Sequence, residues 1–187
     1  MMEAFLVSTG LVALAEMGDK TQLLSLVLAA RFRRPMPIIA AILVATLVNH
    51  ALAGALGASI NSWLGADLMR WILGISFLAM AVWALIPDKL VVAQARPDRF
   101  GVFGTTLIAF FIAEMGDKTQ VATVALAAQY SSLFAVVAGT TLGMVLANAP
   151  VVMFGDRITE HVPMKVVHRI AAAIFALLGV LALLDIG

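Results

Sequence analysis

Long apolar stretches alternate with short polar segments along the whole chain. A helix needs about 20 predominantly apolar residues to cross a bilayer, and six stretches reach that length. Prolines stand in three of the gaps between them, at Pro35, Pro37, Pro87 and Pro163. The pattern predicts an all-α protein with six transmembrane helices, at about Ala4–Ala30, Met36–Leu56, Leu68–Ile86, Val102–Ala128, Leu133–Phe154 and Val166–Leu184.

The first and fourth stretches are longer than a bilayer requires. Each has 27 residues and would extend roughly 40 Å as an unbroken helix. The hydrocarbon core is only about 30 Å thick, so each of these helices is expected to tilt or to break. One octapeptide, AEMGDKTQ, falls near the middle of both, at Ala15–Gln22 and Ala113–Gln120, 98 positions apart.

The octapeptide is one part of a repeat that extends over both halves of the chain. At the same offset of 98 positions, Gly57 matches Gly155 and Phe77 matches Phe175. Because three spans precede the second half, that half must enter the membrane from the opposite side. The sequence therefore predicts an inverted 3+3 repeat, as in many secondary transporters, with repeats at 1–90 and 101–187 and a cytoplasmic linker at 91–100.

Small residues form a ridge on one span of each half. Small residues at i, i+4 spacing let helices approach closely in lipid. Asn49 and Asn148 look like counterparts on these spans but are 99 positions apart, so their register is open by one residue. The ridges consist of Ala41, Ala45 and Asn49 in the first half, and Gly139, Gly143 and Ala147 in the second.

The composition is that of a protein embedded in a lipid bilayer. Apolar residues make up 63% of the chain and charged residues 12%, whereas soluble domains have about 45–50% and about 25%. No polar stretch is long enough to form a separate soluble domain. The net charge of +1, with the basic residues in short loops, provides no patch for nucleic acid. The absence of cysteine excludes disulfides and thiolate ligands.

The basic residues predict the orientation. Cytoplasmic loops of membrane proteins are enriched in lysine and arginine. With both termini outside the cytoplasm, nine basic residues lie on the cytoplasmic side and only Arg70 lies outside. No basic segment precedes the first span, which favours a retained helix over a cleaved signal peptide. The nine residues are Arg31, Arg33, Arg34, Lys89, Arg96, Arg99, Arg157, Lys165 and Arg169.

Each octapeptide places two acids and a lysine inside an apolar span. On a helix, Glu16, Asp19 and Lys20 stand at i, i+3 and i+4, on one face. The glycine before each aspartate weakens the helix, so a kink is expected that turns backbone carbonyls toward the site. Ionisable groups at mid-bilayer are expensive and are functional by default. The two sets are Glu16, Asp19 and Lys20, and Glu114, Asp117 and Lys118, with neutral oxygens from Thr21, Gln22, Thr119 and Gln120.

Counting charges connects these groups to proton exchange. Four carboxylates and two ammonium groups leave a charge of −2, which either one divalent cation or two protons would cancel. Crowded carboxylates titrate as a coupled set, so a pocket of this kind can exchange one for the other. Alternatively, each glutamate and the lysine four residues later form a structural ion pair. For Lys20 and Lys118, charge compensation and a scaffold role both remain open.

All-oxygen ligands favour Mg²⁺, Ca²⁺ or Mn²⁺. Asn49 and Asn148 are further candidate ligands, although interhelical hydrogen bonds would explain them equally well. The thioethers of Met17 and Met115 fit lipid-facing packing better than ion binding.

The three histidines are weaker candidates for metal ligands than the acids. His50 can bind a metal but has no matching histidine in the second half. His161 and His168 fall near a predicted cytoplasmic loop and are interpreted as solvated.

The doubled motif E-x-G-D-[KR]-[ST] resembles that of a family of small cation/proton exchangers, which includes bacterial manganese exporters and Golgi calcium/manganese–proton antiporters. The resemblance extends over essentially the whole chain, and both copies fit without departure. It implies cation/proton antiport. The ion ligands that it implies are Glu16, Asp19, Glu114 and Asp117, with Thr21 and Thr119 as additional candidates.

We therefore predict a secondary antiporter of the bacterial inner membrane that exports Mn²⁺, with Ca²⁺ as the second choice, in exchange for protons. No enzymatic activity and no cofactor are expected, and both a monomer and a homo-oligomer fit the sequence. The alternatives are an exporter of small organic cations or amino acids, an intramembrane metalloenzyme, and a non-transporting assembly factor. The membrane interior contains no arginine to bind a carboxylate, because Arg70 and Arg169 stand near the ends of their spans, and a metalloprotease H-E-x-x-H motif is absent.

Overall fold

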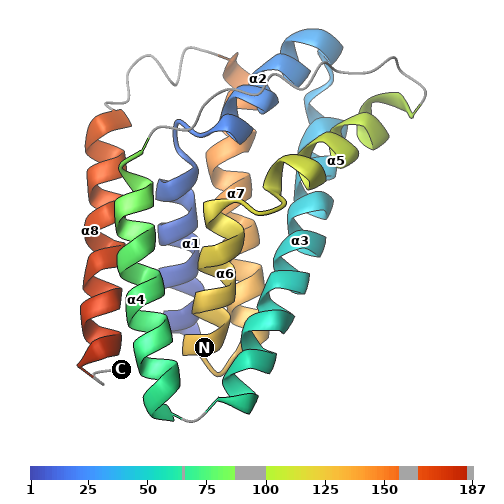
Figure 1. The fold of residues 1–187 in the computed structure, drawn as a ribbon. Coiled ribbons are helices and arrows are strands. Elements are labelled where there is room, and N and C mark those ends of the chain that lie inside the picture. Colours follow the sequence, from blue (N-terminus) through green and yellow to red (C-terminus); the bar gives the residue numbers. More distant parts are fainter. Residues whose placement is uncertain (65, 87–99, 156–163, 185–187) are drawn as a thin grey trace.

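Eight helices form the part of the chain that the computed structural model describes, which is residues 1–64, 66–86, 100–155 and 164–184 (Figure 1). The predicted all-α class is therefore confirmed. The predicted linker at 91–100 lies, except for Phe100, outside the described residues. The helices are α1 (Met2–Glu16), α2 (Lys20–Phe32), α3 (Pro35–Trp63), α4 (Ala66–Ala84), α5 (Gly101–Glu114), α6 (Lys118–Gln129), α7 (Leu133–Phe154) and α8 (Met164–Leu183).

Four of these helices are long and apolar enough to cross a membrane. They are α3, α4, α7 and α8, and they correspond to the second, third, fifth and sixth predicted spans. The apolar helix α5 is shorter, at 14 residues. The qualifying segments are Pro35–Ile60, Asp67–Ala84, Leu133–Phe154 and Lys165–Leu183.

The first and fourth predicted spans are each divided into two helices. Three residues separate α1 from α2, and three separate α5 from α6. At these breaks Gly18 and Gly116 have φ angles of 81° and 74°, in the left-handed region that glycine adopts without the steric penalty of a Cβ atom. The irregularity expected from the excess length is thus a complete interruption of the helix in the middle of the octapeptide.

The two broken helix pairs run in opposite directions. In Figure 1, α1 and α2 lead away from the end of the molecule that carries both termini, whereas α5 and α6 lead back toward it. α1 and α2 pack on α7, and α5 and α6 pack on α3. Each broken pair therefore lies against the long unbroken helix from the other half of the chain, while α4 and α8 pack on each other.

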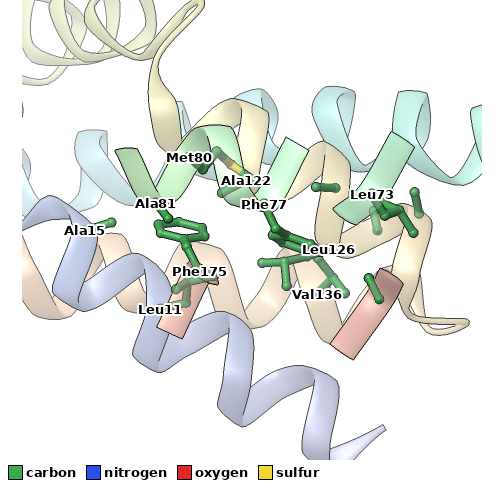
Figure 2. Packing of buried hydrophobic residues seen from close by; sticks show 14 of the residues in the cluster. Leu11, Ala15, Leu73, Phe77, Met80, Ala81, Ala122, Leu126, Val136 and Phe175 are labelled. Atoms are coloured by element: carbon green, nitrogen blue, oxygen red, sulfur yellow. The ribbon is translucent and has the colours of Figure 1, made fainter. Parts of the chain in front are cut away.

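Two apolar clusters fill the interior around the breaks. The first joins α1, α4, α6, α7 and α8, and its largest members are Phe77 and Phe175, which occupy matching repeat positions (Figure 2). The second includes Leu28, Ile42 and Phe110, from α2, α3 and α5. α1 contributes to both clusters, and α2 contributes to the second. Packed side chains therefore hold the chain both before and after the first break.

The predicted ridge on α7 lies directly against the backbone of α1. A Cβ atom at Gly139 would stand 2.6 Å from the carbonyl oxygen of Phe5, and one at Gly143 would stand 2.6 Å from that of Thr9. The matching positions on α3 carry Ala41 and Ala45, which are buried. Glycine is thus required on α7, whereas alanine is accommodated at the same places on α3.

Candidate cation-binding site

The glutamine of each octapeptide satisfies the backbone at the break. The N–H of Gly18 donates to Oε1 of Gln22 over 2.9 Å, and the N–H of Gly116 donates to Oε1 of Gln120 over 2.7 Å. A backbone N–H that has no helical hydrogen bond needs another acceptor, and here a side chain four residues later supplies it. The two glutamine oxygens, which the sequence offered as neutral ligands, are therefore engaged with the backbone.

The aspartates cap the second helix of each pair. Asp19 and Asp117 have extended backbone with φ angles of −82° and −81°, and helical geometry begins at the next residue. Oδ1 of Asp117 accepts a hydrogen bond from the backbone N–H of Lys118 over 2.7 Å. The partial positive charge at a helix N-terminus attracts a nearby negative group, and both aspartates lie at such an N-terminus.

The lysines pair across the two halves of the protein. Nζ of Lys118 lies 2.7 Å from Oδ1 of Asp19, and Nζ of Lys20 lies 3.2 Å from Oδ2 of Asp117. In an unbroken helix each lysine would lie beside the glutamate four residues earlier, and the break removes that geometry. Each half of the chain thus supplies the countercharge for an aspartate of the other half.

The glutamates are the most deeply buried acids of the site. Glu16 and Glu114 are both 0% exposed, and each ends the first helix of its pair. Oε2 of Glu16 accepts from the hydroxyl of Thr21 over 2.5 Å, and Oε2 of Glu114 accepts from that of Thr119 over 3.3 Å. The Oε1 atoms have no hydrogen-bond partner among the described residues. Neutral hydroxyls therefore orient both glutamates.

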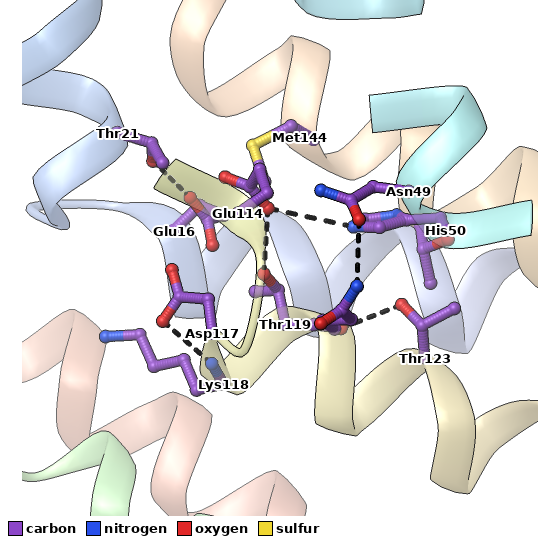
Figure 3. A network of polar contacts seen from close by, with 12 residues as sticks. Glu16, Thr21, Asn49, His50, Glu114, Asp117, Lys118, Thr119, Thr123 and Met144 are labelled. Atoms are coloured by element: carbon purple, nitrogen blue, oxygen red, sulfur yellow. Dashed lines mark hydrogen bonds and ion pairs between the residues drawn. The ribbon is translucent and has the colours of Figure 1, made fainter. Parts of the chain in front are cut away.

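Three of the four predicted acids come close enough together to share one ion. Glu16, Asp19 and Asp117 each offer a carboxylate oxygen, and these oxygens all lie within 4.8 Å of one another. Oxygens bound to the same hard divalent ion lie within about 5 Å of each other, given bond lengths of about 2.0–2.6 Å. Glu114 lies outside this group of three, although Figure 3 shows its side chain near those of Glu16 and Asp117.

The two predicted asparagines form hydrogen bonds between helices. Asn49 accepts from Nε2 of Gln120 over 2.8 Å and donates to the carbonyl oxygen of Phe111 over 3.1 Å. Asn148 accepts from the hydroxyl of Ser25 over 2.7 Å. These contacts join α3 to α5 and α6, and α7 to α2.

The hydrogen bonds of the two glutamines also indicate which residues of α3 and α7 occupy equivalent positions in the two halves. Nε2 of Gln22 donates to the carbonyl oxygen of Ala147 over 3.0 Å, whereas Nε2 of Gln120 donates to Asn49. Because Gln22 and Gln120 are 98 positions apart, Asn49 corresponds to Ala147. The counterpart of Asn148 is therefore His50.

His50 lies next to these carboxylates, although the sequence interpretation gave it less weight because no histidine matches it in the second half. Its side chain is 0% exposed, and its Nε2 lies 3.9 Å from Oε2 of Glu114 (Figure 3). The signal in the sequence was the offset of 98, which pairs it with Asn148.

The interpretation of His168 as a solvated residue was wrong. Its side chain is half-buried, and its Nε2 lies 2.9 Å from the carbonyl oxygen of Met17, at the first helix break. His161 lies outside the described residues.

Comparisons with known proteins point to one family. The model of the family "Divalent cation/proton antiporter GDT1" matches residues 4–91 and 102–186. A Vibrio cholerae protein named "Putative manganese exporter" is 51% identical over 179 residues, which covers 95% of this chain and 89% of that protein. "GDT1-like protein sll0615" of Synechocystis is 26% identical over 203 residues, or 97% of each chain. "GDT1-like protein 5" of Oryza sativa is 26% identical over 225 residues, covering 97% and 94%.

No solved structure matches this one. The family model and the Vibrio cholerae protein both extend over nearly the whole chain, and the buried carboxylates occupy both copies of the repeated motif. The chain belongs to the GDT1 family of divalent cation/proton antiporters.

Proposed function

We propose that this antiporter exports Mn²⁺ from the cytoplasm in exchange for protons, with Ca²⁺ as a second substrate, and that it acts as a transporter rather than an enzyme. The observation that supports this most strongly is the group of three carboxylate oxygens within 4.8 Å of one another. The choice of Mn²⁺ is supported by the name of the Vibrio cholerae relative. The chain is an integral protein of the bacterial inner membrane, as its apolar helices and this bacterial relative indicate.

The exchangeable charge resides on the glutamates. Asp19 and Asp117 are each paired with a lysine, so these four groups sum to zero. Among the described residues, no lysine or arginine forms an ion pair with Glu16 or Glu114. The charge of −2 therefore belongs to the two glutamates, and either one divalent ion or two protons neutralises it.

The same pairing gives roles to the other residues of the motif. Lys20 and Lys118 compensate the aspartates when no ion is bound, and an arriving cation competes with them for the carboxylate oxygens. The threonines orient the glutamates. The glutamines and the two asparagines, whose oxygens already accept hydrogen bonds, hold the broken helices in place.

The proposed architecture has six spans in an inverted 3+3 repeat with both termini outside the cytoplasm. In this arrangement α1 with α2, and α5 with α6, each cross the membrane as one interrupted span. The opposite directions of the two pairs and the common end for both termini support it (Figure 1). Arg31, Arg33 and Arg34 stand at the junction of α2 and α3, at the end away from the termini. Rocking of one half against the other would expose the site to each side in turn.

Flux through purified protein tests the proposal. Protein in liposomes with an imposed proton gradient should move Mn²⁺ against its own gradient. Glu16→Gln and Asp117→Asn should each abolish this flux, because each removes a member of the three-carboxylate group. Glu3→Gln is the matched control, since Glu3 is an exposed acid in the first turn of α1. Parent-like flux in both site variants would disprove the acidic pocket.

A further inference from the structure

One buried polar side chain next to the carboxylates, that of His50, has no hydrogen-bond partner among the described residues. His50 of α3 is 0% exposed, and neither of its ring nitrogens has a hydrogen-bond partner among the described residues. Burying a polar group without a hydrogen bond destabilises the folded state. Figure 3 shows the imidazole next to the carboxylate of Glu114.

The other half of the protein does not use a histidine at this place. Its counterpart, Asn148, accepts a hydrogen bond from Ser25 and donates one to the carbonyl oxygen of Met144 over 3.1 Å. The fold is thus compatible with an ordinary, fully hydrogen-bonded residue at this position. His50 therefore calls for a reason other than packing.

The distance between His50 and Glu114 fits two ligands of one ion. Their Nε2 and Oε2 atoms are 3.9 Å apart, which is too long for a hydrogen bond. A first-row divalent ion bonds histidine nitrogen and carboxylate oxygen at about 2.0–2.2 Å, so two of its ligands lie about 3 Å apart at a right angle and about 4.2 Å apart when opposite. The observed 3.9 Å lies between these two distances, so a single ion can contact both atoms.

This position adjoins the group of three carboxylates. Glu16, a member of that group, interacts electrostatically with Glu114 as well as with Asp117. Oε1 of Glu114 is also buried without a hydrogen-bond partner among the described residues. Glu114 therefore stands between His50 and the group of three, with one carboxylate oxygen that no described residue engages (Figure 3).

We propose that His50 is a ligand of the transported ion, which it binds together with Glu114, and that its nitrogen makes the carrier prefer Mn²⁺ over Ca²⁺. The proposal rests on the proposed function and specifies the selectivity of the same site. Calcium takes oxygen ligands almost exclusively, whereas imidazole binds first-row transition ions. One nitrogen in an otherwise all-oxygen site favours Mn²⁺ for this reason.

Pulsed electron paramagnetic resonance of Mn²⁺ bound to the purified protein tests for this nitrogen directly. The parent should show a coupling from ¹⁴N that changes to a ¹⁵N coupling when the protein is grown with ¹⁵N-labelled histidine. This measurement needs no substitution. His50→Asn, which installs the residue found at position 148, should remove the coupling although His161 and His168 remain.

Titrations of the same proteins with Mn²⁺ and with Ca²⁺ give a second measurement. His50→Asn should weaken Mn²⁺ binding about 10-fold and leave Ca²⁺ binding within about 2-fold, as loss of one nitrogen ligand predicts. Thr46→Val is the matched control. It removes another buried polar group that has no hydrogen-bond partner among the described residues, one turn away on α3, and should retain both the coupling and the parent's Mn²⁺ affinity.

The outcomes separate this proposal from the proposed function. Bound Mn²⁺ without any histidine coupling in the parent, or with an unchanged coupling in His50→Asn, overturns the role of His50 and leaves Mn²⁺ export intact. Equal losses of Mn²⁺ and Ca²⁺ affinity in His50→Asn overturn the selectivity. A parent protein that binds no Mn²⁺ overturns both.

Discussion

The two octapeptides are identical in sequence but not in surroundings. The hydrogen bond from threonine to glutamate is 2.5 Å long in the first copy and 3.3 Å long in the second. The lysine side chain is 30% exposed in the first copy and 4% exposed in the second. The same eight residues therefore form two different halves of the candidate site, and the long helices that pack against them differ.

Part of the difference in surroundings comes from residues of α3 and α7 that differ in the sequence, and this part is the same in every conformation. His50 on α3 faces the second copy, whereas Asn148 on α7 belongs to the surroundings of the first. Gly139 and Gly143 bring α7 against α1, whereas alanines stand at the matching positions of α3. In a carrier that opens to one side at a time, the two halves must also differ in each state. Differences between the two halves are therefore of two kinds: those fixed by the sequence, and those that the transport cycle would reverse.

The largest effect is expected from comparing the two glutamates. Glu16→Gln removes a member of the three-carboxylate group and should weaken Mn²⁺ binding about 100-fold, or about 3 kcal/mol. Glu114→Gln keeps that group intact and should weaken binding about 10-fold. Isothermal titration of both variants measures the difference. Equal losses would mean that the two half-sites contribute equally and that Glu114 belongs to the main group.

The lysines should differ in their contribution to stability. Lys118→Met leaves Asp19 buried without that partner and should lower the free energy of unfolding by about 3 kcal/mol. Lys20→Met affects a more exposed pair and should lower it by about 1 kcal/mol. Thermal unfolding in one detergent compares the two. The double variant Lys118→Met/Asp19→Asn is the control and should regain part of the loss, and a double variant as unstable as the sum of its parts would contradict the pairing.

The smallest difference between the two halves is expected at the helix ridges. Gly143→Ala places a Cβ atom 2.6 Å from the carbonyl oxygen of Thr9, so α1 and α7 must separate, which should cost about 2 kcal/mol. The reciprocal change on α3, Ala45→Gly, creates only a small void and a less favoured helical residue, at about 1 kcal/mol. The same unfolding measurement ranks them. The reverse order would show that α3, not α7, makes the tighter contact.

The local features of the fold followed from the sequence. The excess length of two spans and the glycine before each aspartate both predicted irregular helices, and both helices are interrupted there. Length and hydropathy are properties of single segments, so they can be evaluated without knowing what packs against what. The identity of the buried acids followed in the same way, because ionisable groups are rare inside apolar spans.

The partners of these groups could not be read from the sequence in this way. The pairing of Lys118 with Asp19, over 99 positions, depends on how two broken helices meet in space. His50 could not be recognised from the repeat, because its counterpart in the second half is Asn148 and not a second histidine. His168 was assigned to the solvent from its place in the chain, but α8 brings it to the carbonyl oxygen of Met17.

The crossed ion pairs also bear on how the protein is made. Asp19 leaves the ribosome 99 residues before its partner Lys118, and at about 5–20 residues per second that interval lasts roughly 5–20 s. During this time the first half carries an acid whose countercharge has not yet been synthesised. Until the second half has been synthesised, the charge of Asp19 must be neutralised by a proton or screened by the membrane insertion machinery. The two halves can therefore neutralise each other only after the second has been synthesised.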